Sequence, residues 1–169
     1  MNTFMDTLSK KIMPFANKLG QNRYLTVLRD AFMLSFPLTM FGSIIVVITN
    51  LPFFNDATKA TLTELLSNGQ NATMSIMTVF VTFGIGYYLS NSYDVDGIFG
   101  GAVSFASFLI LTPFMMTTDK GVDVSGVLSL DRLGAKGMFI GMIAAFIAAE
   151  IYCRITKKGW QIKMPDGVP

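Results

Sequence analysis

The sequence of 169 residues contains no histidine and a single cysteine, Cys153. Without histidine the chain lacks the side chain that most often exchanges protons near neutral pH, which excludes histidine-based acid–base catalysis. One cysteine excludes an internal disulfide framework and a cysteine-rich metal site. No cluster of carboxylates points to another metal site. We therefore expect no catalytic residue, no cofactor and no metal site in this chain.

Charged residues are also scarce. They make up 14% of the chain, whereas a typical soluble domain contains about 25%. Hydrophobic residues make up 51%, and the formal net charge is only +2. Such a small charge argues against a nucleic-acid partner. The composition favours a protein that lies in a lipid bilayer.

No side chain from residue 31 to residue 49 carries a charge. As a helix this stretch would be about 28 Å long, close to the hydrocarbon thickness of a bilayer. Pro37 and Gly42 are tolerated in a membrane helix, where neighbouring helices satisfy the freed backbone groups. Arg23 and Arg29 precede the stretch and favour a cytoplasmic start. We predict a first transmembrane helix here.

Three further apolar segments are predicted to be spans, at about residues 73–90, 97–117 and 134–155. Gly84 and Gly86 in the second span allow a neighbouring helix to approach closely. Pro113 is expected to break the third span near its end. The predicted fold class is therefore all-α integral membrane, with about four transmembrane helices forming one membrane domain over residues 21–169.

The first twenty residues are predicted to form an amphipathic helix that lies in the membrane interface. Their apolar side chains recur at the spacing of one helical face, at Phe4, Leu8, Ile12, Phe15 and Leu19. Lysines lie beside this face. The alternative is an ordinary amphipathic helix packed on protein.

The segments between the spans are polar. Residues 57–66 are predicted to form a short surface helix with Asp56 as its N-cap. Residues 91–96 read as a solvated turn in which an aspartate caps the next helix. Residues 122–130 alternate loosely, which is compatible with a short hairpin or a re-entrant segment.

The fourth span carries a row of small residues at four-residue intervals, formed by Gly137, Gly141, Ala145 and Ala149. Small residues at this spacing let two helix backbones come close together. We interpret this row as a helix-packing surface. It is the strongest packing signal in the sequence.

Polar side chains inside the spans are few. Glu150 and Arg154 are one helical turn apart and are predicted to pair; a proton relay through Glu150 is the alternative. Cys153 is interpreted as an inert thiol, although Arg154 beside it could lower the pKa of the thiol. The hydroxyl groups of the third span, on Ser104, Ser107 and Thr112, are expected to bond to their own or a neighbouring helix.

Basic residues gather at both ends of the chain. The tail carries an interfacial anchor made of Lys157, Lys158, Trp160 and Lys163. By the positive-inside rule, both termini of a multi-pass protein in the cell (inner or plasma) membrane would then be cytoplasmic.

Three stretches carry a resemblance to a known family: KKIMPFANKLGQNRYLTVLRDAFMLSFPLTMFGSI, FGIGYYLSNSYDVDGIFGGAVSFASFLILTP and the tail KKGWQIKMPDGVP. They resemble the sugar permease, enzyme IIC, of the bacterial phosphotransferase system, in the branch for lactose, cellobiose and related β-linked disaccharides. The similarity extends over essentially the whole chain. It implies a homodimeric permease that passes its sugar to a soluble phosphocysteine partner, enzyme IIB.

The length departs from this family, whose permeases are more than twice as long. The family's principal sugar-binding histidine and glutamate belong to the later half, which implies that this chain contains no substrate-binding residues. The resemblance therefore implies a scaffold and dimer-interface half, which would act on a disaccharide only together with the missing second half. One alternative is a stand-alone membrane protein that oligomerises through the Gly137–Ala149 row. A small channel is disfavoured, because no span presents a wide polar face.

Overall fold

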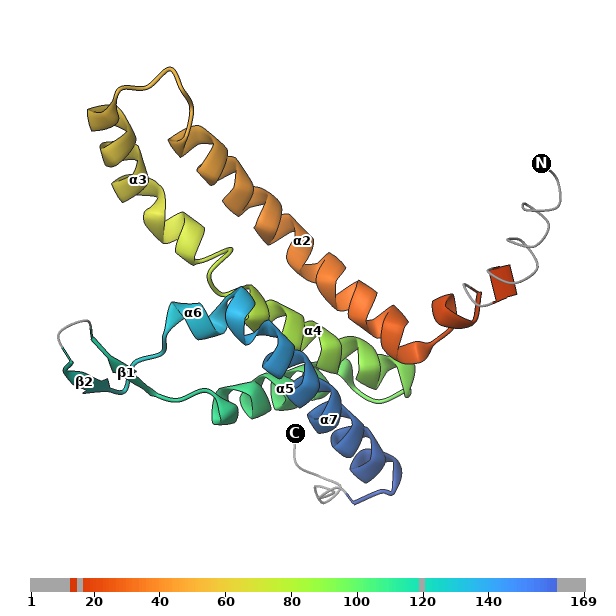
Figure 1. Cartoon of the computed structure of the whole chain (residues 1–169). Helices are drawn as coiled ribbons and strands as arrows, with labels where there is room; N and C mark the ends of the chain where they lie inside the picture. The colour runs from red at the N-terminus through yellow and green to blue at the C-terminus, as the bar shows by residue number, and fades with distance from the viewer. Residues whose placement is uncertain (1–12, 15–16, 119–120, 161–169) are drawn as a thin grey trace, which may run out of the picture.

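A computed structural model describes residues 13–14, 17–118 and 121–160. The described chain is mainly helical and carries one short β-hairpin (Figure 1). In chain order the elements are α2 (Arg23–Thr49), α3 (Asp56–Asn71), α4 (Met77–Ser92), α5 (Gly97–Leu111), β1 (Met115–Thr117), β2 (Asp123–Ser125), α6 (Leu130–Leu133), the 3-10 turn η1 (Ala135–Gly137) and α7 (Met138–Lys157).

Helix α4 lies at the centre of the bundle, in contact with α2, α5 and α7 (Figure 1). The side chains of Val81, Ile85 and Leu89 on α4 are completely buried. They form a core cluster with Ala145 and Ala149 of α7. The apolar residues of α4 are therefore covered by protein on several sides, whereas those of the outer helices are not.

Two glycines of α4 allow its neighbours to come close. A methyl group placed on Gly84 would lie 3.1 Å from the Cα atom of Ala31 in α2. A methyl group on Gly86 would overlap the backbone carbonyl of Gly100 in α5. The structure thus confirms the prediction that these glycines permit a close helix approach.

Helix α2 begins at Arg23, well before the uncharged stretch that predicted it. The side chain of Asn22 caps it, because its Oδ1 atom accepts hydrogen bonds from the backbone N–H groups of Tyr24 (3.0 Å) and Leu25 (3.4 Å). Pro37 lies inside α2 without ending it. Much of the outer surface of the bundle is apolar, with exposed large side chains that include Phe36, Phe41, Ile44, Ile143, Ile147 and Ile151.

Two helical segments of the described chain are long and apolar enough to cross a membrane, Arg23–Thr49 and Ala135–Lys157. Helices α4 and α5 occupy the second and third predicted spans, but they contain only 16 and 15 residues. The total of four transmembrane helices therefore stays a prediction.

The expected break of the third predicted span at Pro113 is confirmed, so the helix stops before residue 117. Helix α5 ends at Leu111, and Thr112 is extended, with φ −95° and ψ 120°. The residue before a proline disfavours the helical region because the ring of Pro113 would clash with it. Residues 115–117 instead form β1, which pairs antiparallel with β2 so that Met116 lies opposite Val124. The start of the second span was predicted too early, since α4 begins at Met77.

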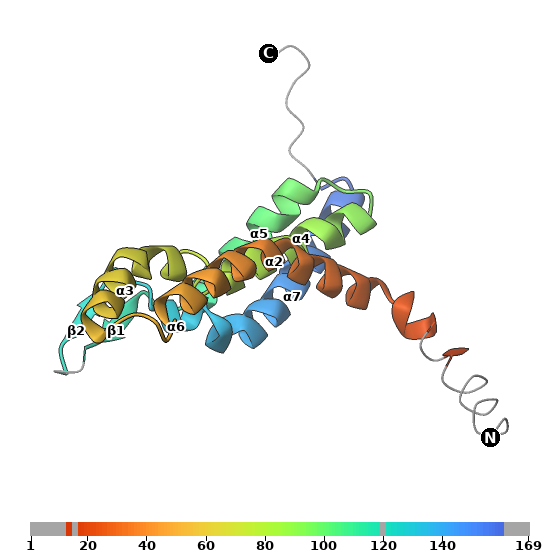
Figure 2. The ribbon, with the colours of Figure 1, turned by 90° about the horizontal axis from the view of Figure 1, so that it is seen from above.

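The polar connections differ in detail from their predictions. The surface helix exists as α3, but its N-cap is Asn55, whose side chain accepts from the N–H of Thr58 at 2.9 Å; Asp56 is the first helical residue. Only the second strand of the hairpin falls within the predicted range 122–130. Figure 2 shows α3 and the hairpin toward the same end of the bundle, away from the start of α2.

Part of the predicted interfacial helix lies outside the described residues. Residues 17–20 are helical and lead into α2, while Phe4, Leu8, Ile12 and Phe15 are not described. The same holds for Lys163 of the predicted anchor. Of the remaining anchor residues, Lys158 places its Nζ atom 5.7 Å from the ring centroid of Trp160.

Candidate functional site

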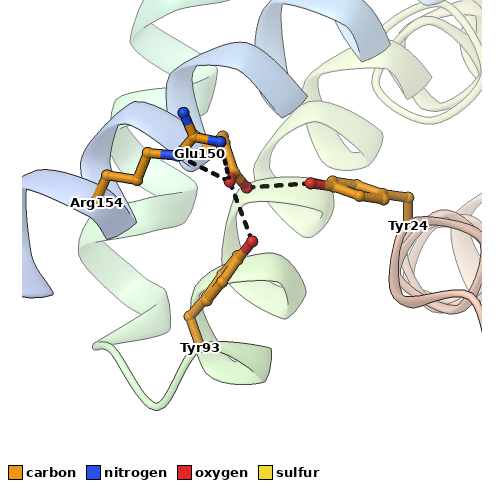
Figure 3. A network of polar contacts seen from close by, with 4 residues as sticks. All are labelled: Tyr24, Tyr93, Glu150 and Arg154. Carbon is orange, nitrogen blue, oxygen red and sulfur yellow. Dashed lines mark hydrogen bonds and ion pairs between the residues drawn. The ribbon is translucent and has the colours of Figure 1, made fainter.

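A partly buried carboxylate joins three helices at the end of the bundle where α2 begins and α7 ends (Figure 3). The Oε1 atom of Glu150 accepts from the hydroxyl group of Tyr93 at 3.0 Å, and Oε2 accepts from the hydroxyl group of Tyr24 at 3.5 Å. Arg154 donates to Oε1 from Nε (3.1 Å) and from its terminal nitrogen (2.9 Å). We call these four residues the polar junction.

The polar junction confirms the predicted pair of Glu150 with Arg154. The sequence did not reveal the two tyrosines, which come from positions 126 and 57 residues away. The side chain of Glu150 is 17% exposed, and a carboxylate at this depth needs partners. Because several donors already occupy it, the geometry favours a structural role over a proton relay.

Two cationic side chains also lie against the ring of Tyr93. The guanidinium carbon of Arg23 lies 4.1 Å from the ring centroid, and the ammonium nitrogen of Lys157 lies 5.2 Å from it. Both distances fit cation–π contacts. Partial burial, followed by the hydrogen bond to Glu150, raises the pKa of the Tyr93 phenol above its ordinary value of 10.0. The phenol therefore stays protonated and remains a donor at neutral pH.

The row of small residues on α7 faces the interior of the chain. Ala145 and Ala149 are completely buried, and a methyl group on Gly141 would lie 2.7 Å from Thr78 and 2.9 Å from Thr82 of α4. Gly137 differs, because it lies in the turn η1 and packs against the backbone of Arg132. Three of the four residues therefore contact other helices of the same chain.

The hydroxyl groups of α5 are used inside the protein, as the sequence predicted. Ser104 donates across to the backbone carbonyl of Ala145 in α7 at 3.2 Å. Ser107 and Thr112 donate to carbonyls of the preceding turn of their own helix. Among the described residues, no buried polar side-chain atom lacks a hydrogen-bond partner. Each of these three hydroxyl groups thus donates its hydrogen bond within the protein.

Cys153 is 1% exposed, and its Sγ atom lies 3.5 Å from the hydroxyl oxygen of Ser90 in α4. This burial agrees with the interpretation of an inert thiol. Within the described ranges, no three potential metal ligands lie together.

Comparison with known proteins gives one consistent result. Residues 29–169 match the family described as "Phosphotransferase system, EIIC". The chain is 57% identical over 168 residues to the "PTS system oligo-beta-mannoside-specific EIIC component" of Bacillus subtilis (strain 168), covering 97% of this chain and 38% of the relative. It is 37% identical over 180 residues to the "PTS system cellobiose-specific EIIC component" of Geobacillus stearothermophilus, covering 100% of this chain and 40% of the relative.

A solved structure has the same fold. The crystal structure of the transporter ChbC, the IIC component of an N,N'-diacetylchitobiose-specific phosphotransferase system, matches with a TM-score of 0.84 and 34% identity. The match covers 96% of this chain and 40% of that one. The chain thus spans about two fifths of the length of these relatives.

Replacing Tyr93 by phenylalanine tests the polar junction. Tyr93→Phe removes one donor from a mostly buried carboxylate, which should destabilise the fold by about 1 kcal/mol. The measurement is the midpoint of thermal unfolding in detergent. Tyr87→Phe is the matched control, because the described contacts include a ring stack with Phe83 but no hydrogen bond from the Tyr87 hydroxyl group. Equal midpoints for both variants would contradict the structural role.

Replacing Gly141 by isoleucine tests the packing of α7. The larger side chain would collide with Thr78 and Thr82, and overpacking of this kind costs about 1–3 kcal/mol. We expect a lower unfolding midpoint and more aggregation during purification. Ala102→Ile adds a similar volume at an exposed position of α5 and should have little effect. A stable Gly141→Ile variant would contradict the contact between α7 and α4.

Proposed function

The chain belongs to the EIIC family of the phosphotransferase system, and we propose that it is the scaffold and dimer-interface portion of a permease for β-linked disaccharides. The observation that carries the proposal is that the match to the relatives covers nearly the whole chain but only about two fifths of each relative. In this proposal the sugar is held by a part of the permease that corresponds to the remaining three fifths of these relatives.

The names of the relatives support the substrate class. The oligo-β-mannoside-specific component is 57% identical to this chain, and the cellobiose-specific component is 37% identical. Both names refer to β-linked sugars. By analogy we propose a β-linked disaccharide as cargo and the soluble enzyme IIB as the partner that phosphorylates it. Both interactions would require the full-length permease.

The absence of a sugar site within this portion is supported by its side chains. A polar disaccharide in a membrane needs several hydrogen-bonding side chains that converge on a wet cavity. The hydroxyl groups of Ser104, Ser107 and Thr112 are engaged with backbone carbonyls. Glu150 is engaged in the polar junction. These residues therefore support a role in holding the fold together.

The alternative of a stand-alone protein that oligomerises through the small-residue row has less support. Gly141, Ala145 and Ala149 are buried within one chain, so they offer no surface to a second copy. A dimer contact would instead use the exposed apolar faces of the outer helices, which carry large side chains such as Phe36 and Ile147.

The proposed topology places both termini in the cytoplasm. Arg23 at the start of α2 and Arg154, Lys157 and Lys158 at the end of α7 lie at one end of the bundle (Figure 1). Excess basic residues remain on the cytoplasmic side of a membrane protein. The short helix α3 would then lie outside.

Cysteine labelling in intact cells tests this topology. A cysteine at Asn68, an exposed position of α3, should react with a membrane-impermeant thiol reagent. One at Lys158 should react only after the cells are permeabilised. Gly121 is less suitable, because its φ of +74° disfavours any side chain. Cys153 is buried and should remain unlabelled in every case, so it serves as the internal control. The reverse labelling pattern would overturn the orientation.

Uptake of labelled cellobiose tests whether this portion is the scaffold and another portion binds the sugar. A cell that lacks its own permease but retains the soluble phosphotransferase proteins should take up no sugar with residues 1–169 alone. Co-expression with the remaining three fifths of a cellobiose-specific relative should restore uptake, because the two parts supply scaffold and sugar site. Ser107→Ala should leave the restored uptake unchanged. Uptake with residues 1–169 alone would overturn the scaffold role and place a sugar site in this portion.

A further inference from the structure

Two cavities lie along the line where α5 and α7 pack together. The first has a volume of about 310 Å³ and is almost entirely apolar; its lining includes Ile110 and Leu111 of α5 and Ala144, Ile147 and Ile151 of α7. The second has a volume of about 590 Å³ and lies at the basic end of the bundle. The two linings follow one face of α7, because Ala148 of the first cavity lies one helical turn before Tyr152 of the second.

The second cavity presents charges of both signs. Lys157 contributes an ammonium group, and Asp94 and Asp96 contribute two carboxylates. No ion pair within 4.0 Å joins these residues in the part of the chain that the structure describes. The carboxylate of Asp96 accepts from the N–H of Ile98 at 2.8 Å and caps α5, which confirms that an aspartate of this turn is a helix cap. Asp94 and Lys157 face the cavity with separated charges.

A ligand that fits both cavities has a defined chemistry. It needs an apolar chain for the first cavity, an anionic group for Lys157 and a cationic donor for the carboxylates. The three charged side chains of the second cavity sum to −1, which disfavours a purely anionic headgroup. A zwitterionic headgroup with a primary amine complements the two signs of charge. We propose that the α5–α7 seam binds an aminophospholipid, with its phosphate on Lys157 and its ammonium group on Asp94.

The surroundings favour a lipid over a soluble zwitterion. The exposed side chains of α7 next to the seam, Ile143, Ile147 and Ile151, are apolar and would face acyl chains in a bilayer. Lys158 and Trp160, which are residue types that anchor membrane proteins among headgroups, follow α7. The second cavity borders the polar junction, because the Nζ atom of Lys157 lies 5.2 Å from the ring centroid of Tyr93. The proposed lipid binding does not depend on the transport role proposed above.

Native mass spectrometry of the delipidated chain in detergent tests this proposal. The probes are phosphatidylethanolamine, phosphatidylcholine and phosphatidylglycerol with identical acyl chains. We expect phosphatidylethanolamine to bind at least about fivefold more tightly than the other two lipids. This ratio corresponds to one additional charge-assisted contact of about 1 kcal/mol. Phosphatidylcholine keeps the positive charge but has no N–H donor, and phosphatidylglycerol has no positive charge.

Three variants separate the contributions of Asp94 and Lys157 to lipid binding. Asp94→Asn should remove the preference for phosphatidylethanolamine over phosphatidylcholine; asparagine tolerates the φ of +56° that Asp94 adopts, so the turn should be retained. Lys157→Gln should weaken the binding of phosphatidylethanolamine and phosphatidylcholine alike, by about fivefold. Lys158→Gln, which removes a neighbouring charge outside the cavity, should change neither. Circular dichroism of each variant verifies that the helices are intact.

Two outcomes would overturn the proposal. The first is equal binding of the three lipids, or a preference for phosphatidylglycerol that Asp94→Asn leaves unchanged. The second is displacement of the bound lipid by soluble glycerophosphoethanolamine at equal concentration, which would assign the second cavity to a soluble zwitterion. Either result leaves the uptake and labelling experiments unaffected, so failure here is distinguishable from failure of the proposed function.

Discussion

The close approach of three helices to α4 is the constraint on which the rest of the structure depends. Between membrane helices, lipid supplies no hydrophobic driving force, so association relies on packing and on hydrogen bonds. Gly84 and Gly86 let α2 and α5 approach the backbone of α4. On the facing side of α7, Gly141 makes room for the threonines of α4. Larger residues at these positions would separate the helices and expose the core.

This mode of packing also explains why hydroxyl groups in the helices bond within the protein. Thr78 donates to the carbonyl of Gly134 at 2.6 Å, and Ser104 donates to that of Ala145. In an apolar environment an unpaired hydroxyl group is costly, so hydroxyl groups that bridge two helices stabilise their contact. These bridging hydrogen bonds support the scaffold role that we propose for this portion.

The polar junction sets the register of the helix ends. Glu150 of α7 gains donors from other helices only when α2 brings Tyr24 and the end of α4 brings Tyr93 to the same place (Figure 3). A slip of α7 along α4 would leave Arg154, on α7 itself, as the donor to this carboxylate and would remove both tyrosine hydroxyl groups. The cations around Tyr93 then surround this junction at the end of the bundle that we propose to be cytoplasmic.

The sequence by itself determined the membrane class, the approximate positions of the helices, the Glu150–Arg154 pair and the family, because these depend on composition, on local spacing and on matching residues in order. Local chemistry also explains the end of α5, since Pro113 excludes helix from Thr112, although the apolar run continued past it. Only the tertiary structure decided that Tyr24 and Tyr93 meet Glu150, and that the row from Gly141 to Ala149 faces α4 and α5 of the same chain. Those contacts join residues far apart in sequence, and helix periodicity specifies a face but not the partner that covers it.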